Sequence, residues 1–301
     1  MNSAFVAGMC ELRQMVERLG FTHFWIALAA ALSAAGSLFA FSNSALLEAS
    51  DWEFLMAIGT CTGWVYTFQR WMKSTRKPEQ MPPYRLEFMR KHGGRLGVLW
   101  TILAIWASCH WLLGLKNTSG SMDALHGLLI LLAAVLGIGY AFNPMGSGRG
   151  WRERPHLKLP TIALSWTLAT VVFPASHVGL NWWGMESLPL WGLACSQILF
   201  VAGITVPFDV RDLNLDPREF QTWPQRWGAF KSIRIALLLL ALSAGGFVLF
   251  DVNWGRASVA ILALPLVAWT VRPRKEAVYS LLLDGLLILQ GSAVLWFGVS
   301  H

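Results

Sequence analysis

The stretch that decides the fold covers residues 187–217 and reads SLPLWGLACSQILFVAGITVPFDVRDLNLDP. Its first part, residues 187–208, carries no charged side chain. A helix needs about 20 such residues to cross the hydrocarbon core of a bilayer. Three aspartates follow at once, at positions 209, 212 and 216. The stretch therefore predicts a membrane-spanning helix that ends in an acidic cluster.

The composition of the whole chain agrees with this class. Of the 301 residues, 55% are hydrophobic and 14% are charged, whereas a soluble domain carries about 25% charged residues. The apolar content rules out a disordered chain, and it disfavours a nucleic-acid-binding domain despite the net charge of +7. Because backbone polar groups in lipid are satisfied within helices, we expect an all-α, polytopic protein whose environment is the lipid bilayer.

The spans can be counted from the apolar runs. The whole chain, residues 1–301, is predicted to be a single integral membrane domain, and residues 1–19 are predicted to be a cytoplasmic amphipathic segment and not a cleavable signal peptide. Nine runs are long enough to cross a bilayer: residues 20–42, 52–72, 95–115, 122–142, 159–177, 187–208, 230–251, 255–271 and 275–298.

The basic residues orient these spans. With nine spans, all but two of the 24 Lys and Arg residues fall on the same side of the membrane, the exceptions being Lys116 and Arg256. Cytoplasmic loops carry the excess of Lys and Arg. We therefore expect a multi-pass protein of the cell inner membrane, with a cytoplasmic N-terminus and an external C-terminus. The acidic cluster then lies at the cytoplasmic face.

The spacing of the acidic cluster suggests a ligand site. Asp209, Asp212 and Asp216 form the pattern DxxDxxxD, and on a helix of about 100° per residue they share a face within about 60°. Carboxylates this close repel one another, so one or more of them stays protonated unless a cation lies between them. Oxygen ligands of this kind suit Mg²⁺ together with substrate phosphates. The alternative to a ligand site is a solvated helix end with three surface acids. This alternative is weakened because most neighbours of the acids on that side of the membrane are Arg and Lys residues.

With these features the chain resembles the UbiA superfamily of intramembrane prenyltransferases. Residues 221–228, QTWPQRWG, look like the segment that leads into the seventh helix of that family. Residues 140–144 and 152–158 look like its loop after the fourth helix, and Asp284 with Gly285 is also similar. The resemblance implies a nine-transmembrane-helix bundle. It also implies two Asp-rich segments, at the ends of helices two and six, which hold Mg²⁺ and the diphosphate of an isoprenyl donor.

The first of these two segments departs from the family. Residues 66–74 read YTFQRWMKS, and alignment of the two halves places Thr67, Arg70 and Ser74 where the second half has its aspartates. One hypothesis is that Arg70 replaces a lost metal by binding phosphate oxygens. Another is that the lineage has lost catalysis and kept a binding or assembly role. Arg70 as an ordinary basic anchor at the membrane surface is the third.

The resemblance assigns roles to individual residues. It implies that the three aspartates of the second segment are catalytic and bind Mg²⁺. Asp284 lies about 13 Å inside the last span, where it either orients an acceptor or forms a structural pair. The residues that it implies for diphosphate binding are Thr67, Arg70, Lys73, Tyr140, Arg152, Arg154 and Lys158.

These roles define the predicted function. It is the Mg²⁺-dependent transfer of a polyprenyl group from an isoprenyl diphosphate to an apolar or aromatic acceptor, of unspecified identity and chain length. The alternative is a catalytically inactive UbiA-like protein that binds a prenyl lipid or a partner membrane protein. A small-solute transporter is a third reading, against which stands the lack of paired charges inside the spans beyond Asp284.

Overall fold

The structure is a computed structural model that describes residues 20–42, 47–117, 124–141, 150–151, 154, 156–182, 184–251, 254–275 and 278–298. Within these residues every regular element is a helix, which confirms the all-α class. The predicted amphipathic segment, residues 1–19, lies outside them.

In the described part of the chain, each predicted apolar run falls on a helix. A π-helical stretch, η3 (Leu168–Val172), joins α6 to α7, and another, η7 (Val278–Leu283), leads into α12. The helices on the predicted runs are α2 (Phe24–Phe41), α3 (Ala49–Arg76), α4 (Pro83–Asn117), α5 (Ala124–Ala141), α6 (Lys158–Thr167), α7 (Phe173–His177), α8 (Leu188–Arg211), α10 (Ala229–Phe250), α11 (Gly255–Trp269) and α12 (Asp284–Gly298).

Several of these helices suit a membrane. In the described residues, five helical stretches are long and apolar enough to cross one: Phe24–Phe41, Pro83–Gly114, Lys158–His177, Leu188–Asn214 and Ala229–Phe250. Others, including α11, are apolar but shorter.

The end of one helix and the start of the next differ from the prediction. Helix α4 begins at Pro83, whereas the predicted span begins at residue 95, and α3 runs on to Arg76 instead of ending at residue 72. Residues 84–92 are rich in charged residues that favour helix, and proline is well suited to a first helical turn. Apolar runs therefore located the membrane parts of these helices but missed their polar extensions.

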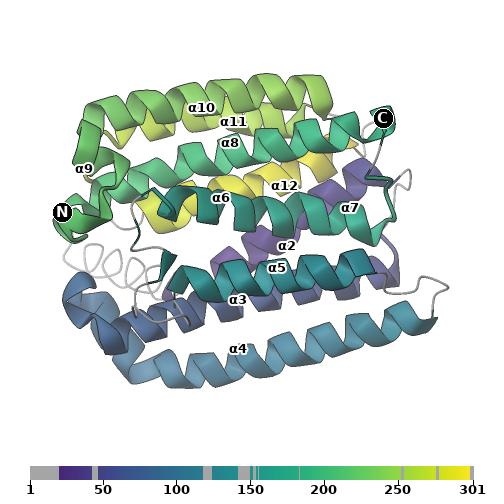
Figure 1. Ribbon diagram of the computed structural model, residues 1–301, viewed down its shortest axis with the longest axis horizontal. Helices are drawn as coiled ribbons and strands as arrows, with labels where there is room; N and C mark the ends of the chain where they lie inside the picture. The colour runs from purple at the N-terminus through teal and green to yellow at the C-terminus, as the bar shows by residue number, and fades with distance from the viewer. Residues whose placement is uncertain are drawn as a thin grey trace, which may run out of the picture.

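The helices run back and forth between two ends of a bundle (Figure 1). The α3–α4 pair forms one flank and α10 the other, and α2 and α12 lie between them. The connections after α3, α8 and α11 lie at one end of the bundle, and those after α7 and α10 lie at the opposite end. The acidic cluster follows α8, so it lies at the first of these ends.

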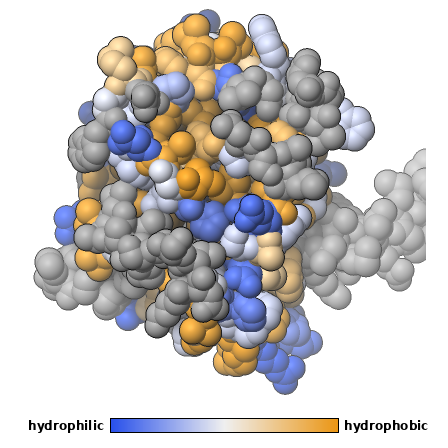
Figure 2. Space-filling model, turned by 90° about the vertical axis from the view of Figure 1, so that its right-hand side faces the viewer, coloured by the Kyte–Doolittle hydropathy of each residue, from blue (hydrophilic) through white to orange (hydrophobic). Residues whose placement is uncertain are grey.

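The outside of the bundle is apolar over much of its length. On α4, Val98, Ile102 and Ile105 are each about 60% exposed, and Leu249 on α10 and Trp296 on α12 are more exposed still. Figure 2, which looks onto the end of the bundle away from the acidic cluster, shows hydrophilic side chains among hydrophobic ones, several of them near the middle. Exposed apolar side chains on several helices of this kind suit a lipid environment.

Small residues let the central helices approach closely. The backbone of α2 passes so near Gly291 of α12 that any side chain there would overlap Leu32 and Ser33. Gly36 on α2 faces the same glycine. Close approach of this kind is typical of packing between membrane helices, where small residues lie at the contact.

Candidate functional site

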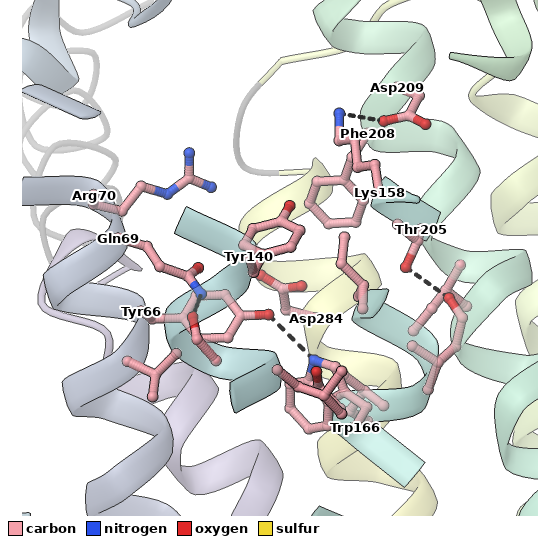
Figure 3. Close-up of a pocket in the computed structure, with 18 of the residues that line it drawn as sticks. Tyr66, Gln69, Arg70, Tyr140, Lys158, Trp166, Thr205, Phe208, Asp209 and Asp284 are labelled. Atoms are coloured by element: carbon pink, nitrogen blue, oxygen red, sulfur yellow. Dashed lines mark hydrogen bonds and ion pairs between the residues drawn. The ribbon is translucent and has the colours of Figure 1, made fainter. Parts of the chain in front are cut away.

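One cavity of about 170 Å³ lies among α3, α5, α6, α8 and α12 (Figure 3). Its polar wall contains aromatic hydroxyls, an amide, basic groups and carboxylates: Tyr66, Tyr140, Gln69, Arg70, Lys158, Arg211, Asp209, Asp212 and Asp284. Its apolar wall consists chiefly of Val65, Leu136, Ile162, Trp166, Val201, Ile204, Phe208 and Leu287.

The two kinds of wall are separated along the helices. On α8 the cavity residues run from Asp212, just past the end of the helix, to Val201, which lies about 16 Å deeper at 1.5 Å per residue. On α6 the cavity residues run from Lys158, the first residue of the helix, to Trp166, again from a charged residue at the helix end to an apolar one inside the bundle. The cavity therefore has a polar end near the helix termini and an apolar end inside the bundle, a shape that suits an amphiphilic molecule.

The acidic segment is not one continuous helix, so the prediction of a shared helical face was wrong. Helix α8 ends at Arg211, and Asp212 opens a short 3-10 turn, η5 (Asp212–Asn214). The amide of Asp216 donates to the carbonyl oxygen of Asp212 at 2.8 Å. Pro217 disfavours the α conformation of the residue before it. The three carboxylates are nevertheless all buried.

Lys158 brings two of these carboxylates together. Its Nζ lies 2.5 Å from Oδ1 of Asp209 and donates to Oδ2 of Asp216 at 3.0 Å. The lysine side chain is itself buried, and it reaches the cluster from the start of α6. The sequence predicted that these acids either keep a proton or share a cation, for which Mg²⁺ was suggested. In the structure the ammonium of Lys158 lies between two of them.

Asp212 has a different basic partner, Arg211. The guanidinium donates through Nε to Oδ1 at 2.7 Å and through Nη2 to Oδ2 at 3.1 Å. Its Cζ also lies 4.9 Å from the centre of the Tyr279 ring. A bidentate pair of this kind holds the carboxylate in a fixed orientation.

A magnesium ion requires near-octahedral oxygen ligands at about 2.0–2.1 Å. The ammonium of Lys158 occupies the space between Asp209 and Asp216, and Asp216 does not line the cavity. Among the described residues, no group of three or more His, Cys, Asp or Glu side chains is placed to hold a metal. The residues as they stand do not fit a three-aspartate magnesium site.

The opposite wall of the cavity comes from α3. Figure 3 shows Arg70 and Gln69 across the cavity from Lys158 and Asp209. Gln69 Nε2 donates to the carbonyl oxygen of Gly137 on α5 at 3.3 Å. Arg70 therefore adds a guanidinium to the polar end from the side that carries no Asp-rich segment.

Two tyrosines and a carboxylate occupy the middle of the cavity. The hydroxyl of Tyr66 accepts a hydrogen bond from Nε1 of Trp166 at 3.2 Å, and Figure 3 shows Tyr140 and Asp284 beside it. Asp284 is half-buried and begins α12 directly after the π-helical stretch η7. Such stretches are frequent at functional sites.

Other predicted site residues lie elsewhere. Thr67 is fully buried, with Oγ1 2.9 Å from Nδ1 of His23, and is not part of the cavity wall. Lys73 lies almost one turn beyond Arg70 and does not line the cavity either. Arg154 is exposed and lies before α6, away from the cavity wall. Arg152 lies outside the described residues.

Several wall residues were missed by the sequence analysis, among them Tyr66, Gln69, Trp166 and Arg211. Tyr66 and Arg70 are four residues apart and share one face of α3, as do Lys158, Ile162 and Trp166 on α6. This spacing of three to four residues is visible in the sequence, but it does not indicate which face of each helix meets the others.

Comparison with known protein families and with curated proteins finds no match to this chain.

Proposed function

We propose that this chain is a prenyltransferase-like membrane protein, a nine-helix bundle of the UbiA type in the inner membrane, with its N-terminus and the polar end of the cavity at the cytoplasmic face. The cavity takes an isoprenyl diphosphate, and the prenyl group is transferred to an apolar or aromatic acceptor. The observation that carries the proposal is the cavity itself, which joins a charged end to an interior walled by Ile162, Trp166, Val201 and other apolar side chains.

The ligand binds with its diphosphate at the polar end. Guanidinium groups bind phosphate oxygens in a bidentate manner, and Arg70 lies at that end on the wall away from the acids. The prenyl tail lies along the apolar wall, where Ile204 and Leu287 replace the water that would otherwise surround it. Binding of this kind excludes a small polar solute, because such a molecule would leave the apolar wall without a partner.

The transfer step follows from this placement. The allylic carbon–oxygen bond breaks, and its electron pair leaves with the diphosphate, whose charge Arg70 stabilises at the polar end. The acceptor carbon forms the new bond to the allylic carbon and loses a proton. Asp284 lies in the cavity beside Tyr66 and Tyr140, where it is placed to take that proton. No step is assigned to Mg²⁺, because the aspartates do not fit a metal in this arrangement.

A second function is favoured by a separate observation. The carboxylates of the acidic segment already contact Lys158 and Arg211, and the first segment carries no aspartate. Both features suit a protein that binds a prenyl lipid, or presents it to a partner membrane protein, without cleaving it.

One experiment separates the two functions. Full-length protein in detergent is incubated with labelled farnesyl and geranylgeranyl diphosphates and a panel of quinone-type, chlorin and phospholipid acceptors, and both bound ligand and released diphosphate are measured. Release that depends on an acceptor supports transfer, whereas saturable binding without release supports the second function. Absence of binding for every chain length contradicts both. Arg70→Ala should abolish binding, and Arg234→Ala, which changes an exposed residue of α10, serves as the matched control.

A further inference from the structure

We propose that the ammonium of Lys158 is a permanent counter-cation of the acidic segment, which holds Asp209 and Asp216 together in place of a divalent metal. The cavity then binds its anionic ligand without Mg²⁺. The inference rests on the proposed function only for the identity of that ligand, because the state of the carboxylates can be tested without it.

The first support is that one ammonium joins two elements that are distant in sequence. Lys158 contacts Asp209 on α8 at 2.5 Å and Asp216 beyond η5 at 3.0 Å. Both carboxylates and the lysine are at least nine-tenths buried, with exposed fractions of 4%, 6% and 8%. Charges this deeply buried are stable only when they are paired, so the contact is a permanent part of the fold and not a transient surface pair.

The second support is that the backbone around Asp216 is held independently of any ligand. Nε2 of Gln225 donates to the carbonyl oxygens of Asp216 and Pro217 at 3.0 and 3.1 Å. The amide of Thr222 donates to Oε1 of the same glutamine at 3.0 Å. The carboxylate is therefore presented to Lys158 by a fixed scaffold.

The third support is the charge balance. One ammonium between two carboxylates leaves a single negative charge there, and Arg211 neutralises Asp212. A metal ion would first have to displace the buried ammonium from both carboxylates. Removal of the ammonium should favour metal binding, since it leaves two neighbouring carboxylates whose oxygen atoms are the ligands that Mg²⁺ prefers.

Lys158→Met tests this role of the ammonium through the direction in which the melting temperature changes. Without the ammonium the two carboxylates repel each other, so the melting temperature should fall by about 5–10 °C. Millimolar Mg²⁺ should restore several degrees of that loss. The wild-type protein should show no shift with Mg²⁺ beyond that of NaCl at matched ionic strength.

The control is Lys231→Met, which removes an exposed lysine of α10 that lies outside the cavity. It should behave as the wild type does in both salts. Lys158→Arg, which keeps the charge, should also remain insensitive to Mg²⁺. A wild-type melting temperature that rises with Mg²⁺ overturns the proposal, and so does a folded Lys158→Met variant that ignores the metal.

If Lys158→Met does not fold, the wild type and Lys158→Arg decide the question. Binding of labelled farnesyl diphosphate should be the same within about twofold in EDTA and in Mg²⁺, and binding at least tenfold tighter with Mg²⁺ overturns the proposal. If no prenyl diphosphate binds under either condition, the proposed function fails, while the effect of Mg²⁺ on the melting temperatures of the wild type and Lys158→Arg still decides the role of Lys158.

Discussion

Replacing Asp209 by asparagine distinguishes a metal-binding aspartate from one that serves as the partner of a lysine. A carboxylate that held Mg²⁺ against a diphosphate would be needed for binding, so its loss would abolish affinity. If Asp209 instead pairs with Lys158, its loss leaves that ammonium attached to Asp216. The polar end then gains one unit of positive charge, and affinity for an anion rises.

The size of the gain follows from electrostatics. Two unit charges about 8 Å apart interact by about 2 kcal/mol at an effective dielectric constant of 20. Removing the carboxylate of Asp209 should therefore strengthen binding of an anionic head group by about 1–2 kcal/mol, or about five- to thirtyfold. The fold loses part of a buried ion pair, so the free energy of unfolding should fall by about 1–3 kcal/mol.

The assay is equilibrium binding of labelled farnesyl diphosphate to full-length Asp209→Asn and wild-type protein, in EDTA, with melting temperatures measured in parallel. Asp251→Asn provides a comparison at a buried carboxylate that lies at the opposite end of the bundle and pairs with Arg256, and it should lower stability without raising affinity. Loss of binding in folded Asp209→Asn would refute the reasoning.

Three further predictions concern the remaining parts of the molecule. Arg70→Ala should weaken binding of the same ligand at least tenfold, and Arg70→Lys by less, because an ammonium keeps the charge but not the bidentate geometry; equal affinity in all three proteins would remove Arg70 from the site. Gly291→Ala should lower stability by about 1–3 kcal/mol, because the new methyl group meets the backbone of α2. Gly245→Ala, where the added carbon meets nothing within 4 Å, should not lower the melting temperature. Arg256→Met should lower the free energy of unfolding by about 3–5 kcal/mol, because it removes the basic partner of the buried carboxylate of Asp251. The double variant with Asp251→Asn should recover part of the loss in thermal unfolding.

The helical bundle was predictable because residues that cross the hydrocarbon core of a bilayer are apolar, so the spans stand out as apolar runs in the sequence. Apolar runs such as residues 230–251 became helices with nearly the same bounds, here Ala229–Phe250. The polar first part of α4, from Pro83, was missed because hydropathy does not report helix formation outside the bilayer. The acidic segment was expected to continue the helix, but α8 ends at Arg211 and a 3-10 turn follows. Pro217 restricts only the residue before it, so the position of this end could not be read from the proline.

The site was predictable only in part. Asp209, Arg70 and Asp284 do line one cavity. The predicted topology brings the helix ends that carry Asp209 and Arg70 to the same face, and Asp284 reaches the cavity from within the last span. The pairing of Lys158 with Asp216 joins residues 58 positions apart, and no local pattern encodes it. Alignment of the two halves suggested that Thr67 corresponds to Asp209. In the structure Thr67 instead contacts His23, the residue directly before α2. Equal spacing in two segments therefore does not mean that corresponding side chains reach the cavity, because the packing of each helix decides which of its faces lines the cavity.

The most direct test of the central claim is equilibrium binding of labelled farnesyl diphosphate to full-length protein in lipid nanodiscs, in the presence of EDTA. The cavity described here predicts saturable binding at one site per chain, lost in Arg70→Ala and kept in Arg234→Ala. Binding that does not saturate, or that is the same in both variants, would contradict it.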